Sequence, residues 1–281
     1  MYSLIAGPLS VEALTIPIQG LSKSQQGTKL VQLSDLHFDG LRLSEQLLQQ
    51  AIDITNEVEP DLILLTGDYV TDDPNPIYEL ARLLKTLQSR AGIYAVLGNH
   101  DRYYPESQAK ITTALIQVGI QVLWDQVAYP LGEELALIGL RDYWARPFNP
   151  GPVMAQVPPE TPRIVLSHNP DSAKILKQWR VDLQLSGHTH GGQVVIPGIG
   201  PVALGIKKLR RRVPKSLQRC LPSWAIKYDK TVQHWEWAQG LHEVGNNLLY
   251  VNRGLGTYLP GRLFCPPEVT VITLTCKNSR D

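Results

Sequence analysis

The stretch LSGHTHGGQ, residues 185–193, sets two histidines two positions apart at the point where an apolar run ends. The run before it has the character of a buried strand, and Gly187 breaks that run ahead of His188 and His190. Imidazoles just past a strand end are typical of metal ligands or catalytic bases. Partners for these two side chains are therefore to be sought at the other strand ends of the chain.

Composition excludes several classes of protein. The chain has 281 residues, of which 43% are hydrophobic and 19% charged, as in an ordinary globular protein with a sizeable core. A net charge of +1 provides no global field for nucleic acid, and no nucleic-acid partner is expected. Cys220, Cys265 and Cys276 are widely spaced and odd in number, which argues against a disulfide framework or a cysteine zinc site and favours a reducing compartment.

No targeting segment is evident. Residues 1–20 lack the basic start and long apolar core of a signal peptide. No stretch reaches the roughly 18 unbroken apolar residues that a membrane span needs. We expect a cytoplasmic protein, and an anchor upstream of Met1 stays an open alternative.

Short apolar runs alternate with segments of helical period. Strands are predicted over 28–35, 60–68 and 91–101, each followed by a helix, over 41–58, 77–90 and 106–119. Further on, the predicted strands come closer together, and one more helix is predicted, over 172–181. These strands cover 121–124, 128–132, 134–140, 161–170, 182–190, 246–254 and 268–276. The order predicts an α/β fold with two sheets and helices outside them.

One region departs from the rest in composition. Residues 197–246 are richer in Pro, Gly, Lys, Arg and Trp than their surroundings. We therefore expect a single domain over 1–281 with a basic, cap-like insert at about 197–246.

Side chains able to bind metal follow five of the predicted strands. In α/β folds the crevice outside the carboxyl ends of the strands is where sites form, so these side chains are expected to converge. They are Asp35, His37, Asp68, Asn99, His100, Asp101, His168, His188 and His190.

The kinds of ligand narrow the chemistry. Carboxylate and amide oxygens mixed with imidazoles, without thiolates, suit manganese, iron or zinc better than magnesium or calcium. Seven of these side chains, all but His100 and Asp101, are too many for one ion. They would fill two sites only if a carboxylate bridged the ions, and Asp68 is the natural bridge. Two such ions activate a shared water and clamp the oxygens of a phosphoryl transfer.

In this order, DLH, GD, GNHD, H and GHTH resemble the five-motif signature of the calcineurin-like metallophosphoesterases, over about residues 28–192. The resemblance implies a four-layer αββα sandwich with two mixed sheets and a dinuclear site at the strand edge. It implies one ion held by Asp35, His37, Asp68 and His190. It implies a second held by Asp68, Asn99, His168 and His188. His100, paired with Asp101, would then face the leaving-group oxygen as a general acid or as a hydrogen-bond donor in the transition state.

The closing segment RGLGTYLPGRLFCPPEVTVITL, residues 253–274, is similar to a bacterial branch of the family. That branch includes membrane-associated enzymes and UDP-diacylglucosamine pyrophosphatases. The leading hypothesis is a metal-dependent phosphohydrolase in which a metal-bridging hydroxide attacks a phosphodiester or a lipid-linked diphosphate. A catalytically silent scaffold for protein partners and a protein phosphatase are the alternatives.

Other residues have a structural and a functional interpretation. Arg253 at a strand end is either a substrate-binding group or a salt-bridge partner. Residues 205–226 are either a solvated basic loop or a peripheral contact with an anionic membrane. His234 and His242 are interpreted as ordinary polar residues, and Asp39 as a loop or cap residue.

Overall fold

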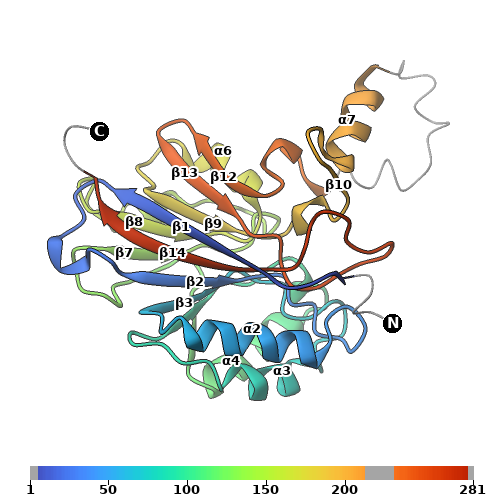
Figure 1. Cartoon of the computed structure of the whole chain (residues 1–281). Coiled ribbons are helices and arrows are strands. Elements are labelled where there is room, and N and C mark those ends of the chain that lie inside the picture. The colour runs from blue at the N-terminus through green and yellow to red at the C-terminus, as the bar shows by residue number, and fades with distance from the viewer. Residues whose placement is uncertain (1–5, 213–230, 278–281) are drawn as a thin grey trace.

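The computed structural model describes residues 6–212 and 231–277 of the chain, and two six-stranded sheets form its centre (Figure 1). The first sheet has the order β1 (Ser10–Ile18), β14 (Glu268–Cys276), β2 (Lys29–Leu33), β3 (Leu62–Leu65), β4 (Ile93–Ala95) and β5 (Ile120–Val122). The second has the order β12 (Gly240–Val244), β13 (Asn247–Val251), β9 (Leu183–Ser186), β8 (Arg163–Leu166), β7 (Ala136–Gly139) and β6 (Gln126–Ala128).

Both sheets are mixed. In the first, β2, β3, β4 and β5 run parallel, whereas β14 is antiparallel to β2. In the second, β7, β8, β9 and β13 run parallel, with β6 and β12 antiparallel at the edges. The parallel strands of each sheet therefore deliver their carboxyl ends to one edge.

Strand alternation divides the core into layers. Leu30, Leu62 and Leu64 face the second sheet, where they pack in one cluster with Ile164 and Leu183. The intervening residues of the same strands face the opposite way, toward the helices α2 (Glu45–Glu57), α3 (Ile77–Leu84) and α4 (Ser107–Gln117). Both faces of the strands are thus apolar, as in parallel sheets covered on both sides.

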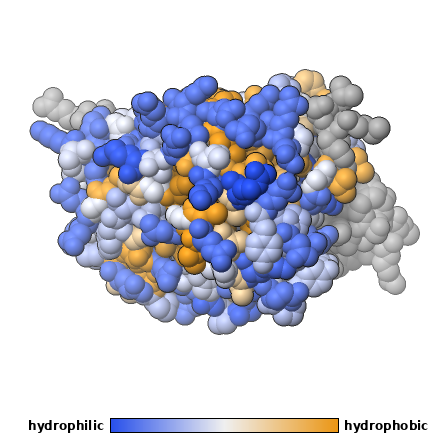
Figure 2. All heavy atoms as spheres, turned by 90° about the horizontal axis from the view of Figure 1, so that it is seen from below, coloured by the Kyte–Doolittle hydropathy of each residue, from blue (hydrophilic) through white to orange (hydrophobic). Residues whose placement is uncertain are grey.

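Short helices cover the outer face of the second sheet. Met154 from α5 (Gly151–Met154) and Leu176 from α6 (Ala173–Leu176) pack with Ile138 and Val165 of its strands. The predicted α/β fold is confirmed as a four-layer sandwich of two mixed sheets between helices. Seen from the side of α2, α3 and α4, the surface is mostly hydrophilic, with hydrophobic side chains in separate patches (Figure 2).

Local signals set the ends of α2. The Ser44 hydroxyl accepts a hydrogen bond of 3.2 Å from the Leu47 amide, which caps the first turn. At the other end, Glu59 takes a positive φ of 52° and Pro60 follows it, so the helix does not continue. The adjoining turns lead the chain from β2 through α2 into β3.

Several elements differ from the sequence-based expectation, among them one helix and two edge strands. The helix predicted over 172–181 is reduced to α6, and a 3₁₀ turn over Pro170–Ser172 precedes it. β1 was not predicted, because most of its side chains are exposed or half-buried at the sheet edge and its apolar pattern is weak. β12 was not predicted either, and it lies inside the range 197–246 while forming the edge of the second sheet.

The other described residues of that range lie outside the two six-stranded sheets. A two-stranded ribbon, β10 (Val195–Ile196) and β11 (Gly200–Pro201), leads into α7 (Val202–Arg212), which projects from the sandwich in Figure 1. Ala203 at its start packs with Val232 and Trp235. The described residues also form the 3₁₀ turns η1 (Lys23–Gln25), η2 (His100–Arg102), η4 (His190–Gly192) and η6 (Trp235–Trp237). No helix of the described residues is long and apolar enough to cross a bilayer.

Candidate metal centre

Two groups of potential ligands lie at the joined edge of the two sheets. One comprises Asp35, His37 and His190, and the other comprises Asp68, His168 and His188. Within each group the ligand atoms lie within 4.8 Å of one another, and all six residues are buried. Each group draws side chains from both sheets, because the loops after β2 and β3 meet those after β8 and β9.

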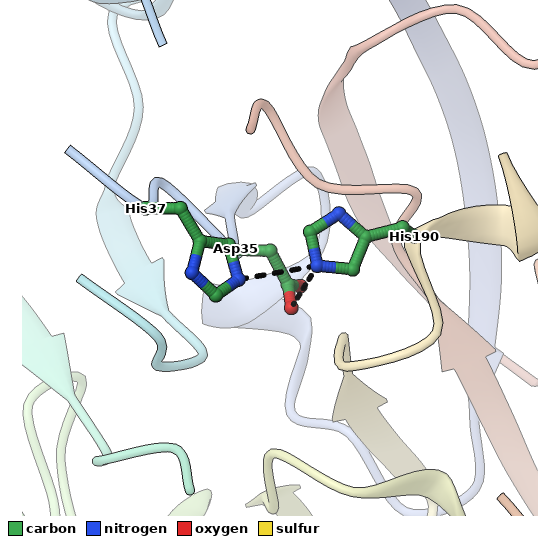
Figure 3. A group of neighbouring side chains, drawn as sticks. All are labelled: Asp35, His37 and His190. Atoms are coloured by element: carbon green, nitrogen blue, oxygen red, sulfur yellow. Dashed lines mark hydrogen bonds and ion pairs between the residues drawn. The ribbon is translucent and has the colours of Figure 1, made fainter. Parts of the chain in front are cut away.

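In the first group the two imidazoles point toward each other above the carboxylate (Figure 3). The Nε2 atoms of His37 and His190 are 3.1 Å apart, and His190 Nε2 is 3.5 Å from Asp35 Oδ1. Two imidazole nitrogens and a carboxylate oxygen that converge in this way form a suitable set of cation ligands.

Asp68 lies between the two groups. Its Oδ2 atom is 3.5 Å from His37 Nε2 and 3.1 Å from His168 Nε2. One carboxylate therefore contacts an imidazole of each group, which is the position that a bridging ligand takes.

The backbone at the ligands is left-handed. Asp35, His37, Asp68, His188 and His190 have φ values of 49°, 44°, 58°, 70° and 51°. Such values are uncommon outside glycine and cluster at functional sites, where each costs on the order of 1–3 kcal/mol. The conformation turns consecutive side chains from the strand ends into the same space.

Two glycines of the motifs make room for the carboxylates. A Cβ atom on Gly98 would lie 2.1 Å from Asp68 Oδ1, and one on Gly187 would lie 2.2 Å from Asp35 Oδ2. The motifs GNHD and GHTH therefore need glycine, because Asp68 packs directly on the backbone of Gly98 and Asp35 packs directly on the backbone of Gly187.

Burial sets the protonation of most of the imidazoles. It lowers the pKa of His188 to about 3 and that of His190 to about 4, and it lowers the pKa of His37 well below the ordinary value. Burial also opposes protonation of His168, but the charge of Asp68 and its hydrogen bond raise that pKa to about 10. Three imidazoles are thus neutral and ready to bind a cation, and His168 forms an ion pair with Asp68.

The amide of Asn99 supplies a further test of whether ions fit. Its Oδ1 atom is buried and has no hydrogen-bond partner within the described part of the chain. A buried acceptor without a partner is costly, and a cation beside it would satisfy it. Together with the neutral imidazoles and the carboxylates, this atom makes the residues suitable for two divalent cations.

His100 lies at the edge of the site. Its ring contacts the His37 ring edge-on with centroids 4.9 Å apart, and 28% of its side chain is exposed. The Nδ1 atom lies 2.6 Å from the Thr71 carbonyl oxygen, so this nitrogen carries a proton and donates it. The other ring nitrogen, Nε2, is left for a substrate.

The expected pairing of His100 with Asp101 is wrong. The Asp101 carboxylate is buried and accepts hydrogen bonds of 2.8 Å from the backbone amides of Asp68, Tyr69 and Gly98. These amides converge on it because the turns after β3 and β4 lie side by side. Asp101 therefore holds the backbone that carries Asp68, and the Thr71 carbonyl orients His100.

Arg253 forms salt bridges in the structure. Its Nε atom is 2.7 Å from Glu268 Oε2, and its Nη2 atom pairs with Glu12. The guanidinium thus joins the end of β13 to β14 and β1, which supports the salt-bridge interpretation over the substrate-binding one. Asp39 caps its own loop, accepting from the amides of Leu41 and Arg42 at 2.9 and 2.8 Å.

The two remaining histidines lie outside both ligand groups. His234 pairs with Glu236 at 2.7 Å and stacks on Trp237. His242 Nε2 lies 2.9 Å from the Gln239 carbonyl oxygen. The segment proposed to touch a membrane, 205–226, is described only as far as Arg212, and its residues 213–226 lie outside the described residues, as does Cys220.

Sequence reasoning missed Tyr258. Its hydroxyl lies 3.1 Å from His37 Nδ1, and its ring contacts those of His37 and His190 with centroids 5.0 and 5.2 Å away. The Arg42 guanidinium lies 4.5 Å from the centre of the same ring. The position of GLGTY directly after a predicted strand was the available signal.

Arg262 was also missed. Its guanidinium donates to the carbonyl oxygens of Arg253, Gly254 and Gly256 at 2.8, 3.0 and 2.6 Å. Gly256 in turn donates its amide to Asp35 O at 2.7 Å, and its carbonyl oxygen lies 3.1 Å from His190 Nδ1. Arg262 therefore fixes the loop that orients two residues of the first group.

Two ligand groups joined by one aspartate, at the edge of an αββα sandwich, define a dinuclear metallohydrolase. Residues 28–192 match the family model described as calcineurin-like phosphoesterase, and the chain belongs to this family. The predicted family and the predicted hydrolase activity on phosphoesters are thereby confirmed. The family depends on two metal ions, in agreement with the two ligand groups.

Curated relatives are similar over most of their length. The chain is 33% identical over 251 residues to phosphodiesterase YaeI of Escherichia coli strain K12, covering 88% of this chain and 82% of that protein. It is 31% identical over 262 residues to the uncharacterized metallophosphoesterase YkuE of Bacillus subtilis strain 168, covering 90% and 80%. It is 26% identical over 298 residues to UDP-2,3-diacylglucosamine pyrophosphatase LpxG of Chlamydia muridarum, covering 88% and 83%.

Proposed function

We propose that the chain hydrolyses a phosphodiester or a lipid-linked diphosphate with two bound metal ions. The observation that carries this proposal is the position of Asp68 Oδ2, which is in contact with His37 of one ligand group and His168 of the other. Bound ions of this kind activate water as a nucleophile and neutralise charge on the phosphoryl oxygens. A carboxylate shared between the two ligand groups would help to hold both ions.

In this proposal Asp35, His37, Asp68 and His190 hold the first ion. The second is held by Asp68, Asn99, His168 and His188. The second set is supported by the buried Oδ1 atom of Asn99, which lacks a partner in the described part of the chain. Mixed imidazole and oxygen ligands favour manganese, iron or zinc as the ions.

His100 is the proposed catalytic acid. Its Nδ1–H is held by the Thr71 carbonyl oxygen, so the ring is fixed and its Nε2 atom can face the leaving group. In the imidazolium form, Nε2 donates its proton to the leaving-group oxygen as the bond to phosphorus breaks. The partial exposure of the ring leaves it reachable by a substrate.

The substrate class rests on the relatives and on the closing segment. A relative with 33% identity is named a phosphodiesterase, and another with 26% identity is named a pyrophosphatase of a diacylated nucleotide sugar. Both names describe esters with a substituent on each side of the phosphate or diphosphate. They favour such substrates over phosphoproteins, and the complete ligand set argues against a silent scaffold.

A substrate panel tests the proposal. Manganese-loaded protein is assayed on a chromogenic phosphodiester, a chromogenic monoester, a UDP-linked diacyl sugar and a phosphopeptide. We expect turnover of the diester or of the lipid-linked diphosphate to exceed that of the phosphopeptide. Preference for the phosphopeptide would replace the proposal with a protein phosphatase, and inactivity on all four by a protein that holds two ions would contradict it.

A further inference from the structure

Five large apolar side chains are exposed on two segments that lie beside the metal centre. Ile196 and Ile199 are 44% and 72% exposed, and Leu259, Leu263 and Phe264 are 76%, 53% and 66% exposed. We call these five residues the apolar rim. Exposed apolar side chains that occur singly are ordinary, but a group of this kind marks an interaction surface.

Backbone pairing joins the two segments of the rim. The Val195 amide donates to Leu263 O at 2.9 Å, and the Leu263 amide donates to Gln193 O at 2.8 Å. Arg262, next to Leu263, is anchored to the carbonyl oxygens of the preceding loop. The rim is therefore an ordered surface whose apolar side chains are held out of the core.

The rim is continuous with the metal centre. Gln193 follows His190 closely in the chain, and its Oε1 atom accepts a hydrogen bond of 2.6 Å from the Tyr258 amide. Tyr258 contacts His37 through its hydroxyl, and the next residue, Leu259, is the most exposed member of the rim. A partner bound at the rim would thus lie next to the mouth of the site.

The chain segments that carry the rim have charges of one sign in their sequence. Neither 191–212 nor 254–267 contains an acidic residue. The sequence of α7, which begins directly after β11, carries Lys208, Arg210, Arg211 and Arg212. Lys207 of the same helix is buried and donates to Gln233 O, so it is not counted among these charges. Exposed apolar side chains in a part of the chain whose sequence is basic match a surface with an apolar interior and anionic headgroups.

We propose that the apolar rim docks the protein on an anionic lipid bilayer, with the metal centre facing the headgroups. Leu259, Leu263 and Phe264 insert at the headgroup level, and the basic residues of α7 add electrostatic attraction. Nucleic acid fits less well, because Phe264 is the only aromatic member of the rim and bases need several stacking platforms. Docking is independent of the reaction, and only the delivery of a lipid-linked ester rests on the proposed function.

Vesicle flotation tests the docking. Wild-type protein is mixed at low salt with phosphatidylcholine vesicles, or with vesicles that also contain phosphatidylglycerol. We expect binding to the anionic vesicles and little to the neutral ones. The double variant Leu263→Ser, Phe264→Ser should bind the anionic vesicles about tenfold more weakly or worse, because two apolar side chains that insert into the bilayer are lost.

An exposed apolar residue outside the rim provides the matched control. Ile116 on α4 is 55% exposed, and Ile116→Ser should bind vesicles as the wild type does. All three proteins should hydrolyse a small soluble phosphodiester at the same rate. Failure of the wild type to bind anionic vesicles, or equal binding by the double variant, would overturn the docking.

Two further measurements distinguish lipid docking from self-association and from catalysis. If the wild type is a dimer in solution and the double variant a monomer, the rim is a contact between copies and the lipid proposal is wrong. His100→Ala should bind vesicles normally, because the rim is intact in it. Vesicle binding without any phosphoester hydrolysis would contradict the proposed function and leave the docking standing, whereas hydrolysis without vesicle binding would do the reverse.

Discussion

Asp101 Oδ2 accepts a hydrogen bond of 2.8 Å from the backbone amide of Asp68, so one buried carboxylate holds the peptide of the bridging ligand. In the Asp101→Asn variant, only one side-chain oxygen remains to accept hydrogen bonds from the backbone amides that share two oxygens in the wild type. We expect the free energy of unfolding to fall by about 1–3 kcal/mol, the usual effect of a buried donor left unpaired. Urea denaturation of the variant measures it. Asp53→Asn, on the exposed face of α2, is the control, and equal midpoints for all three proteins would contradict the role.

Asp68→Asn tests the bridge. An amide offers one neutral oxygen where the carboxylate offers two charged ones, so we expect bound metal to fall from two ions toward one or none. Elemental analysis of purified protein measures the change. Asp39→Asn removes a carboxylate that bonds to its own loop, to Arg42 and to Thr71 but belongs to neither ligand group, and it should keep both ions. Unchanged metal in Asp68→Asn would show that this carboxylate does not bridge.

His100→Ala should separate metal binding from catalysis. We expect kcat to fall by the equivalent of about 2.7–4 kcal/mol, as when one transition-state donor is removed, with metal content unchanged. His234→Ala is the control, since His234 pairs with Glu236 outside both ligand groups. A His100→Ala variant that loses metal as well as activity would make the residue a structural part of the site.

Tyr258→Phe tests the hydroxyl that contacts His37. The ring contacts are kept while the 3.1 Å contact with Nδ1 is lost. Groups that orient a ligand in this way commonly affect metal affinity by about 10–100-fold. Competition with a chelator should therefore show weaker binding in the variant. Tyr78→Phe, on an exposed position of α3, should bind metal as the wild type does.

The metal-free protein should lose stability in mildly acidic solution. Burial lowers the pKa of His188 to about 3 and that of His190 to about 4, so the unfolded chain binds protons that the folded chain does not. Their stabilising contribution is complete above the ordinary imidazole pKa of about 6.5 and declines below it, by about 1.4 kcal/mol per pH unit for each histidine. The raised pKa of His168 has the opposite effect: its stabilising contribution is complete below about pH 6.5 and is lost as the pH rises from there toward 10.

Chelator-treated protein can be unfolded in urea at pH 7, 6 and 5 to measure this slope. His188→Gln removes one of the titrating groups, so its stability should depend less on pH than that of the wild type. Equal slopes for the two proteins would show that His188 does not contribute to the acid sensitivity.

The sequence was most informative where ligand position depends on the local chain. Asp35, Asp68 and His188 each lie two or three residues past the end of a strand, and parallel strands bring their ends to one edge whatever the details of packing. The direction in which a side chain points cannot be predicted in the same way. Asp101 adjoins His100 in the chain, but its carboxylate turns to the amides of another loop, which no spacing pattern records.

Contacts between residues that lie far apart in the chain also could not be predicted from the sequence. Tyr258 lies in the loop after β13 and contacts His37. Arg262 stabilises that loop by donating to backbone carbonyl oxygens, which every residue has and which therefore leave no mark in the sequence. No sequence motif predicts either contact, because each depends on how the loop after β13 folds over the strand ends. The strand β1 was not predicted for a related reason, since an edge strand with one solvated face has a weak apolar pattern.

Because each ligand group takes side chains from both sheets, bound ions would act as cross-links between the two halves of the sandwich. A sliding of one sheet over the other would pull His190 away from Asp35 and His168 away from Asp68. The apolar layer between the sheets resists separation but has little directional preference, whereas coordination bonds fix a register. The metals would thus determine the mechanical stiffness of the whole molecule along the direction in which its layers can shear.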